Sequence, residues 1–140
     1  MNGFFKSWSP RALSVLRIIA GFLILWHGSQ KLFNFPASEH AVALSGLILT
    51  AGIIELFGGI LIMVGLFTRP IAFLMSGLMA AAYFMAHVPG GFLPLTNRGE
   101  LAVIYSFLYL YFVFSGGGAW SLDGLIRKIS PQRSLAEETA

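Results

Sequence analysis

Residues 41–67 read AVALSGLILTAGIIELFGGILIMVGLF, an apolar run with a single formal charge, Glu55, close to its middle. About 20 apolar residues are enough for a helix to cross the hydrocarbon core of a bilayer, and this run is longer. A carboxylate at mid-bilayer costs roughly 2.5–3.5 kcal/mol on insertion scales, so such residues usually have a partner or a function. The stretch therefore predicts a transmembrane helix and marks Glu55 as a candidate functional residue.

The composition of the whole chain is that of an integral membrane protein. Of its 140 residues, 56% are hydrophobic and 11% are charged, whereas soluble domains carry about 25% charged residues. The sequence contains no cysteine, which excludes a disulfide, a thiolate nucleophile and a thiolate metal site within it. Any thiol chemistry must therefore come from a partner.

Three further helices are predicted around residues 41–67, so the expected fold class is all-α, a four-helix transmembrane bundle. Ser9-Pro10 is typical of a helix start, with serine as N-cap and proline at the first helical position. Asn97 is expected to cap the last of the four helices, with Glu100 reaching back as in a capping box. The predicted helices cover residues 10–33, 41–67, 70–87 and 99–115, within one domain over 1–130.

Three segments outside these helices also carry predictions. Residues 88–96, VPGGFLPLT, cannot form a regular helix and are expected to cover the mouth of the bundle. Residues 121–128 predict a short C-terminal amphipathic helix at the membrane surface. Residues 131–140 are expected to be a disordered tail.

Lysine and arginine are distributed unevenly between the two sides of this predicted bundle. One side receives Lys6, Arg11, Arg69, Arg127, Lys128 and Arg133, and the other receives Lys31 and Arg98. An excess of these residues marks the cytoplasmic side of a membrane protein. We therefore expect both termini in the cytoplasm, with the loop after residue 33 and the segment 88–99 outside.

Several motifs, taken in order, resemble the DoxX family of small four-helix bacterial membrane proteins. They are Arg17-x-x-x-Gly21 leading to His27-Gly28, Glu55-Leu56-Phe57-Gly58-Gly59, His87 with Gly90-Gly91-Phe92, Gly99-Glu100, and Gly116-Gly117-Gly118 before Ser121-Leu122-Asp123. The resemblance spans roughly residues 17–123. It implies a protein of the bacterial inner membrane, linked to systems that oxidise thiosulfate or thiols and reduce membrane quinone.

Glu55, Glu100 and Arg17 are the candidate catalytic residues. Arg17 and Glu55 are expected to contact each other, because a cation and an anion, each near glycines, stand in consecutive antiparallel helices. Such a pair can handle protons or anchor a ligand, or it can simply fix how two helices dock. Glu100 can likewise be a second carboxylate at the outer mouth of the bundle or a helix cap alone.

His27, Lys31, His87, Tyr105 and Tyr109 are the candidate substrate-binding residues. Each also has a plainer interpretation: the lysine can extend to the lipid headgroups, the histidines can hydrogen-bond at the interface, and the tyrosines can be packing residues. A haem between the two histidines is conceivable in a helical bundle. No His-x-x-x-His or Glu-x-x-His pattern accompanies them, so haem is disfavoured and no metal site is predicted.

Together, these residues predict a cavity in the outer half of the bundle that touches Glu55, Glu100 and at least one of His27 and Lys31. Such a cavity suits a small amphiphile, and a quinone is a candidate cofactor. The leading hypothesis is a membrane subunit of a redox system, acting with a redox partner protein. Whether the chain is an enzyme by itself stays open, because it has no cysteine and no cofactor motif.

The alternative hypothesis is a non-catalytic membrane scaffold or a small-molecule transporter. Contact with the lipid bilayer is expected under both hypotheses, and a homo-oligomer is compatible with both. The sequence has no basic patch outside the predicted helices that would suggest nucleic-acid binding.

Overall fold

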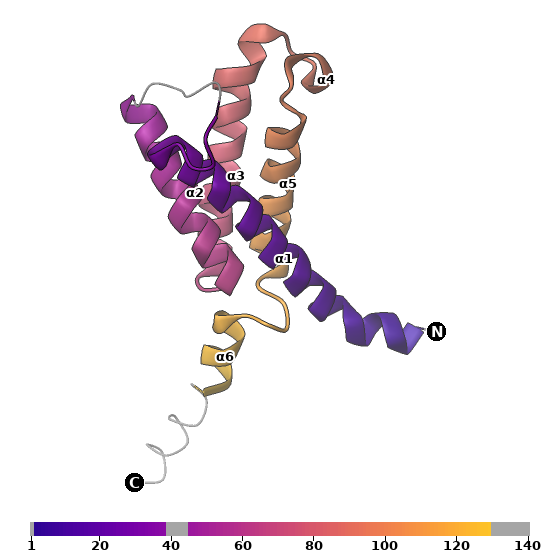
Figure 1. The fold of residues 1–140 in the computed structure, drawn as a ribbon. Coiled ribbons are helices and arrows are strands. Elements are labelled where there is room, and N and C mark those ends of the chain that lie inside the picture. The colour runs from indigo at the N-terminus through magenta and orange to yellow at the C-terminus, as the bar shows by residue number, and fades with distance from the viewer. Residues whose placement is uncertain (1, 39–44, 130–140) are drawn as a thin grey trace.

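The computed structural model describes residues 2–38 and 45–129, which form an all-α bundle without strands (Figure 1). Its principal helices are α1 (Asn2–Phe33), α2 (Gly46–Val64), α3 (Thr68–Ala82) and α5 (Glu100–Ser115). Its shorter elements are the π-helical turn η1 (Tyr83–His87), the 3-10 turn η2 (Val88–Gly90), α4 (Pro94–Asn97) and α6 (Leu122–Ile129). The predicted fold class, a four-helix transmembrane bundle with a short C-terminal amphipathic helix, is confirmed.

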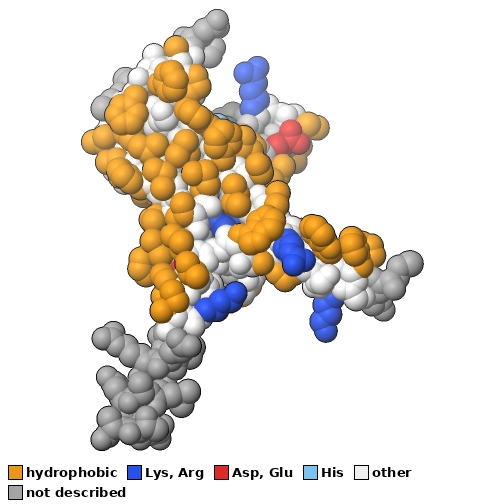
Figure 2. Space-filling view, turned by 60° about the horizontal axis from the view of Figure 1, so that its bottom comes forward, with side chains coloured by type: hydrophobic (Ala, Val, Ile, Leu, Met, Phe, Trp, Pro, Cys, Tyr) orange, Lys and Arg blue, Asp and Glu red, His pale blue; other side chains and the backbone are white. Residues whose placement is uncertain are grey.

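Within residues 2–38 and 45–129, three helical stretches are long and apolar enough to cross a membrane. They are Gly3–Phe33, Gly46–Val64 and Thr68–Gly90. The fourth helix, α5, is also apolar but has 16 residues, which is roughly 24 Å of helix against a hydrocarbon core of about 30 Å. Hydrophobic side chains cover much of the surface seen in Figure 2, as expected of a face turned to lipid.

The helix α1 begins well before its predicted start, and Pro10 lies inside it. A proline within a helix removes one backbone hydrogen bond and crowds the preceding turn. Two side chains supply donors to carbonyl groups of that turn: the Ser7 hydroxyl donates to Phe4 O at 2.8 Å, and Arg11 Nη1 donates to Ser7 O at 3.2 Å. The prediction that Ser9-Pro10 starts the helix is therefore wrong.

The helix α2 is shorter than predicted at both ends. It begins after Ser45, whose hydroxyl accepts a hydrogen bond from Ile48 N at 3.4 Å, and residues 41–44 of the predicted helix lie outside the described residues. It ends at Val64 because Gly65 takes a left-handed conformation, with φ at 72°, and closes the last turn onto Leu61 O and Ile62 O.

The ends of the other helices also depend on local hydrogen bonds. The predicted third helix, 70–87, is found as α3, which ends at Ala82 and passes into the π-helical turn η1. The capping box predicted for α5 is wrong: Gly99 is the N-cap, Glu100 is the first helical residue, and the Asn97 side chain accepts from Gly99 N at 2.8 Å. The predicted helix 121–128 is found as α6, and residues 131–140 lie outside the described part of the chain.

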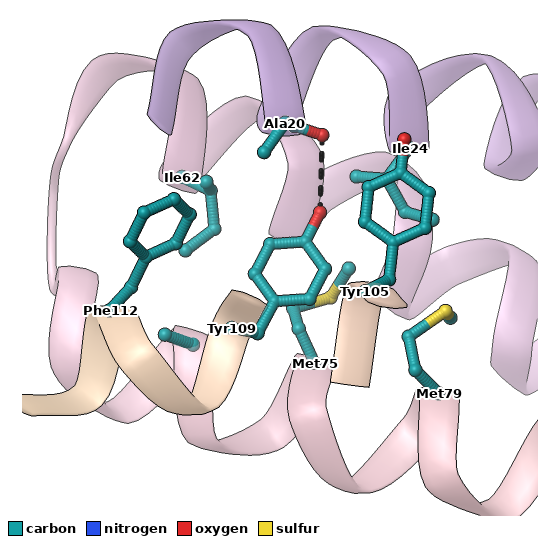
Figure 3. Packing of buried hydrophobic residues seen from close by; sticks show 9 residues of the cluster. Ala20, Ile24, Ile62, Met75, Met79, Tyr105, Tyr109 and Phe112 are labelled. Atoms are coloured by element: carbon teal, nitrogen blue, oxygen red, sulfur yellow. Dashed lines mark hydrogen bonds between the residues drawn. The ribbon is translucent and has the colours of Figure 1, made fainter. Parts of the chain in front are cut away.

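The helices pack as two close pairs, α1 with α2 and α3 with α5, whose facing sides enclose the core. All four helices contribute to a cluster of nine buried residues (Figure 3): Ala20, Ile24, Ile62, Ala72, Met75, Met79, Tyr105, Tyr109 and Phe112. The Tyr109 hydroxyl reaches across this core and donates to Ala20 O at 3.1 Å. The N-terminal end of α1 and the helix α6 lie at one end of the bundle, and α4 lies at the other (Figure 1).

The first turn of α3 is held by a carboxylate from α6. Asp123 Oδ1 accepts from Phe67 N at 2.7 Å, and Asp123 Oδ2 accepts from Thr68 N at 2.8 Å. These are N–H groups that a helix start leaves without partners. Partial burial opposes ionisation of Asp123, but the hydrogen bonds from Thr68 and Phe67 outweigh it, so the pKa of Asp123 lies below its ordinary value.

Asp123→Asn is therefore expected to lower the free energy of unfolding by about 1 kcal/mol at neutral pH, a usual cost for a lost helix cap. Because the folded pKa of Asp123 is depressed, its contribution is present above the unfolded pKa of about 3.9 and is lost as the pH falls through the folded pKa. Unfolding in detergent micelles from pH 7 to pH 3 should show the difference between the two proteins shrink below about pH 4. A difference that stays constant to pH 3 would contradict this role.

Candidate functional site

The buried carboxylate of Glu55 pairs with Lys31. Glu55 is 2% exposed, and Lys31 Nζ donates to its Oε1 in a salt bridge between the last turn of α1 and the middle of α2. The prediction that Glu55 contacts Arg17 is therefore wrong. Its partner is Lys31, for which the sequence had also left open a plainer role, extension to the lipid headgroups.

The register of α1 against α2 explains this choice of partner. Gly28 packs against the backbone of α2 at Gly52 and Leu56, and Gly21 packs against it near Met63. These contacts bring Lys31, one turn after Gly28, beside Glu55. They bring Arg17 near Met63, at the end of α2. Met63 comes eight residues after Glu55, which is about 12 Å of helical rise.

Arg17 is fully buried, and its hydrogen bonds to the described residues all go to backbone carbonyl groups. Its Nη1 donates to Met63 O at 2.7 Å and also to Ile62 O, at the C-terminal end of α2. Its Nε and Nη2 donate to the loop after α5, at Gly117 O (2.8 Å) and Trp120 O (2.5 Å). A cation at the C-terminus of a helix is favourable because unpaired carbonyls carry partial negative charge there. Arg17 thus links α1 to α2 and to the loop after α5 that contains Gly116-Gly117-Gly118, which we call the glycine loop.

A cavity of about 300 Å³ opens between α1, α2, α3 and α5 toward the α4 end of the bundle. Its apolar wall includes Ile24, Met79 and Leu101. Its polar lining comes from His27, Lys31, Glu55, His87, Arg98 and Tyr105. Of the contacts predicted for this cavity, those with Glu55, His27 and Lys31 are found.

Three of the predicted site residues, Arg17, Glu100 and Tyr109, do not line this cavity. Glu100 is exposed at the start of α5, and the mouth of the cavity has Arg98 instead. The expectation that the cavity touches Glu100 is therefore wrong. Tyr109 lies deeper in the core, with its ring nearly parallel to that of Tyr105 at a centroid distance of 5.7 Å.

Arg98 is a charged residue of the cavity lining that the sequence did not predict. It follows α4 in a left-handed conformation, with φ at 59°, and Gly99 behind it packs against the Tyr83 ring. This sharp turn places Arg98 on the cavity and leaves Glu100 outside. A signal was present in the sequence, because Arg98 and Lys31 are the two cations expected on that side of the membrane.

Glu55, one of the residues that line the cavity, carries an unpaired acceptor. Glu55 Oε2 is buried and has no hydrogen-bond partner among the described residues, while Oε1 binds Lys31. A buried acceptor without a partner is rare and costs roughly 1–3 kcal/mol, so it points to a group that the bare protein does not supply. The cavity therefore suits a ligand that donates a hydrogen bond to this oxygen.

His87 contributes another polar group to the lining of the cavity. His87 Nδ1 lies 3.1 Å from Asn97 O, and since a carbonyl can only accept, Nδ1 carries the hydrogen of this contact. The π-helical turn η1 ends at His87, and such widened turns are frequent at functional sites. Within residues 2–38 and 45–129, no three His, Asp or Glu side chains are grouped as metal ligands.

Comparison with known sequences gives consistent matches over most of the chain. The sequence model of the DoxX family matches residues 12–88. An uncharacterized protein of Haemophilus influenzae is 46% identical over 124 residues, which cover 84% of this chain and 92% of that protein. An uncharacterized membrane protein of Mycobacterium tuberculosis is 27% identical over 139 residues, covering 85% and 83%. No solved structure matches this chain.

Proposed function

Because this chain belongs to the DoxX family of membrane proteins, we propose that it is the membrane subunit of a redox system and binds a quinone in the cavity at Glu55. The observation that carries this proposal is the unpaired Oε2 of Glu55, a residue that lines a mostly apolar cavity. A hydroquinone donates through its hydroxyl groups, which suits that oxygen. The quinone form accepts through its carbonyl oxygens, which suits the cationic donors Lys31 and Arg98.

The shape of the cavity supports a ligand with a flat ring and an apolar tail. Its volume, about 300 Å³, is at the lower end of the range for small-molecule sites, so it accommodates a headgroup rather than a whole isoprenoid quinone. Tyr105, 5% exposed, forms part of the buried wall. His27 and Arg98 are exposed at the open end. The tail would therefore leave the cavity toward the lipid.

Reduction of the quinone needs two electrons and two protons, and this chain has no oxidisable thiol. Two thiols from a partner would supply both as they join in one disulfide, so that two thiols and a quinone yield a disulfide and a hydroquinone. In this scheme Glu55 holds a proton next to the bound ring and passes it to the ring oxygen. Lys31 stabilises the carboxylate that remains until another proton arrives.

We further propose the bacterial inner membrane as the location, with the α4 end outside. The support is the distribution of charge: Lys6, Arg11, Arg69, Arg127 and Lys128 belong to the end with α6, whereas Lys31 and Arg98 belong to the α4 end. Under the positive-inside rule the α6 end is cytoplasmic. Reporter fusions after Ile129 should then read cytoplasmic, and fusions at Leu95 should read external. The opposite pattern would contradict the orientation.

The direct test is the quinone content of the full chain, purified in a mild detergent from a quinone-containing bacterial membrane. Wild-type protein should release quinone on solvent extraction. Glu55→Gln should retain at most about one tenth of the wild-type amount of quinone, because the amide cannot act as a carboxylate acceptor next to Lys31. Glu100→Gln is the matched control, since Glu100 lies outside the cavity, and it should retain the wild-type amount.

Activity supplies the second measurement. Membranes containing wild-type protein should reduce added quinone at the expense of a dithiol faster than membranes containing Glu55→Gln, at equal amounts of folded protein. Wild-type protein that carries no quinone and gives no such activity would contradict the proposal and favour the scaffold or transporter. Equal quinone content in wild type and Glu55→Gln would place any bound quinone elsewhere.

A further inference from the structure

A second cavity lies at the α6 end of the bundle, away from the quinone site. Its volume is about 340 Å³, and it is enclosed by the α2–α3 connection, the glycine loop after α5, and α6. Most of its lining is apolar, with Ile126 of α6 contributing to the wall. Three charged residues line it as well: Arg69, Arg127 and Asp123. No part of this cavity is used in the function proposed above.

The charges of this cavity favour an anion. The Asp123 carboxylate lines it, but its two oxygens already accept from Phe67 N and Thr68 N. Arg69 uses Nη1 for Val113 O at 3.1 Å, and Arg127 uses Nε for Asp123 O at 3.3 Å. Within residues 2–38 and 45–129 neither arginine forms a salt bridge with a carboxylate, so each has further N–H donors available. The lining therefore carries a net positive charge.

The helix α6 indicates where such an anion would come from. Its apolar residues Leu125, Ile126 and Ile129 are 53%, 53% and 64% exposed, although they stand beside the basic residues Arg127 and Lys128. A helix with exposed apolar side chains and adjacent basic residues lies in the plane of the bilayer interface. The cavity thus opens at the level of the lipid headgroups, at the end where α6 and the N-terminal part of α1 lie (Figure 1).

We propose that this cavity binds the phosphate headgroup of an anionic phospholipid, between Arg69 and Arg127. Guanidinium groups match phosphate oxygens in geometry and charge, and basic pockets at the ends of transmembrane helices are suited to lipid headgroups. The acyl chains would extend along the exposed apolar side chains of α6. A soluble phosphate would satisfy the arginines equally, but it would gain nothing from the apolar wall at Ile126.

The test uses the full chain in detergent micelles with an equimolar mixture of phosphatidylglycerol and phosphatidylcholine, and counts bound lipids by native mass spectrometry. Wild-type protein should bind phosphatidylglycerol in preference. Arg69→Gln/Arg127→Gln should lose at least about tenfold of that affinity, since each arginine near a lipid surface contributes a few-fold. The matched control is Lys6→Gln/Arg11→Gln, which removes two exposed cations at the same end but outside the cavity, and it should keep the preference.

Several results would overturn the proposal. Equal losses in both double variants would mean a diffuse attraction to the basic end of the molecule. Unchanged binding in Arg69→Gln/Arg127→Gln would exclude the cavity. Competition by inorganic phosphate as strong as that by phosphatidylglycerol would assign the site to a soluble anion. If Arg69→Gln fails to fold, because Arg69 holds Val113 O, the exposed Arg127→Gln alone should still lower the affinity several-fold, and no loss there would also overturn it.

Discussion

Arg17→Met is expected to lower the free energy of unfolding by at least about 4 kcal/mol, a loss that exceeds most single substitutions. The side chain is fully buried and donates to Ile62 O, Met63 O, Gly117 O and Trp120 O. Methionine fills part of the volume but donates nothing. Ile62 O keeps its hydrogen bond from Gly65 N, but each buried carbonyl that is left unpaired costs roughly 1–3 kcal/mol. Unfolding in detergent micelles, followed by the loss of helical signal, measures the difference.

Two control variants separate this role from charge alone. Arg17→Lys should recover only part of the loss, because one ammonium group cannot replace the planar guanidinium that reaches α2 and the glycine loop together. Arg11→Met, at an exposed position on the same helix, should change the free energy of unfolding by no more than about 0.5 kcal/mol. Wild-type stability in Arg17→Met would contradict the structure of this contact.

The same residue allows a test of which cation pairs with Glu55. Arg17 and Glu55 share no hydrogen-bond partner, since Glu55 pairs with Lys31. The losses from Arg17→Met and Glu55→Gln should therefore add to within about 0.5 kcal/mol in the double variant. Lys31→Met and Glu55→Gln, in contrast, should be non-additive. Strong coupling between positions 17 and 55 would restore the pair that the sequence had suggested.

Gly28→Ala is expected to have the second large effect, a loss of about 3 kcal/mol. A Cβ atom at Gly28 would lie 2.4 Å from Leu56 N and 2.8 Å from Gly52 O, both of which are backbone atoms of α2. Backbone cannot move aside as a flexible side chain can, so α1 and α2 must separate, and overpacking of this kind costs typically 1–3 kcal/mol or somewhat more. Thermal unfolding of the purified variant in detergent measures the loss.

A glycine in α3 supplies the matched control for this substitution. A Cβ atom at Gly77 would have nothing within 4 Å. Gly77→Ala should therefore stabilise the protein by about 0.4–1 kcal/mol, because alanine favours a helix more than glycine does and leaves the unfolded chain fewer conformations. Gly28→Ala should also lower the quinone content of the purified protein, because the same contact brings Lys31 beside Glu55. Equal stabilities of the two alanine variants would contradict the close contact of α1 with α2.

Local sequence was enough to predict the main helices and their order. The apolar run at 41–67 exceeds a membrane span, and glycine and proline mark the breaks near Pro70, Pro89 and Gly116. Hydrophobic length and turn residues act over a few positions, so they can be read without knowing the fold. The same local reasoning identified Glu55, since a lone carboxylate in such a run is costly wherever the helix packs.

Only the tertiary structure decided how the charged residues are paired. Whether Glu55 meets Arg17 or Lys31 depends on the register of α1 against α2, which is set by the contacts of Gly21 and Gly28 with a helix distant in sequence. The presence of Arg98 in the cavity, rather than Glu100, likewise depends on a left-handed residue after α4 that repositions the chain at the start of α5. Residue spacing along one helix predicts neither the partner of Glu55 nor the place of Arg98 in the cavity, because both depend on contacts between segments that are distant in sequence.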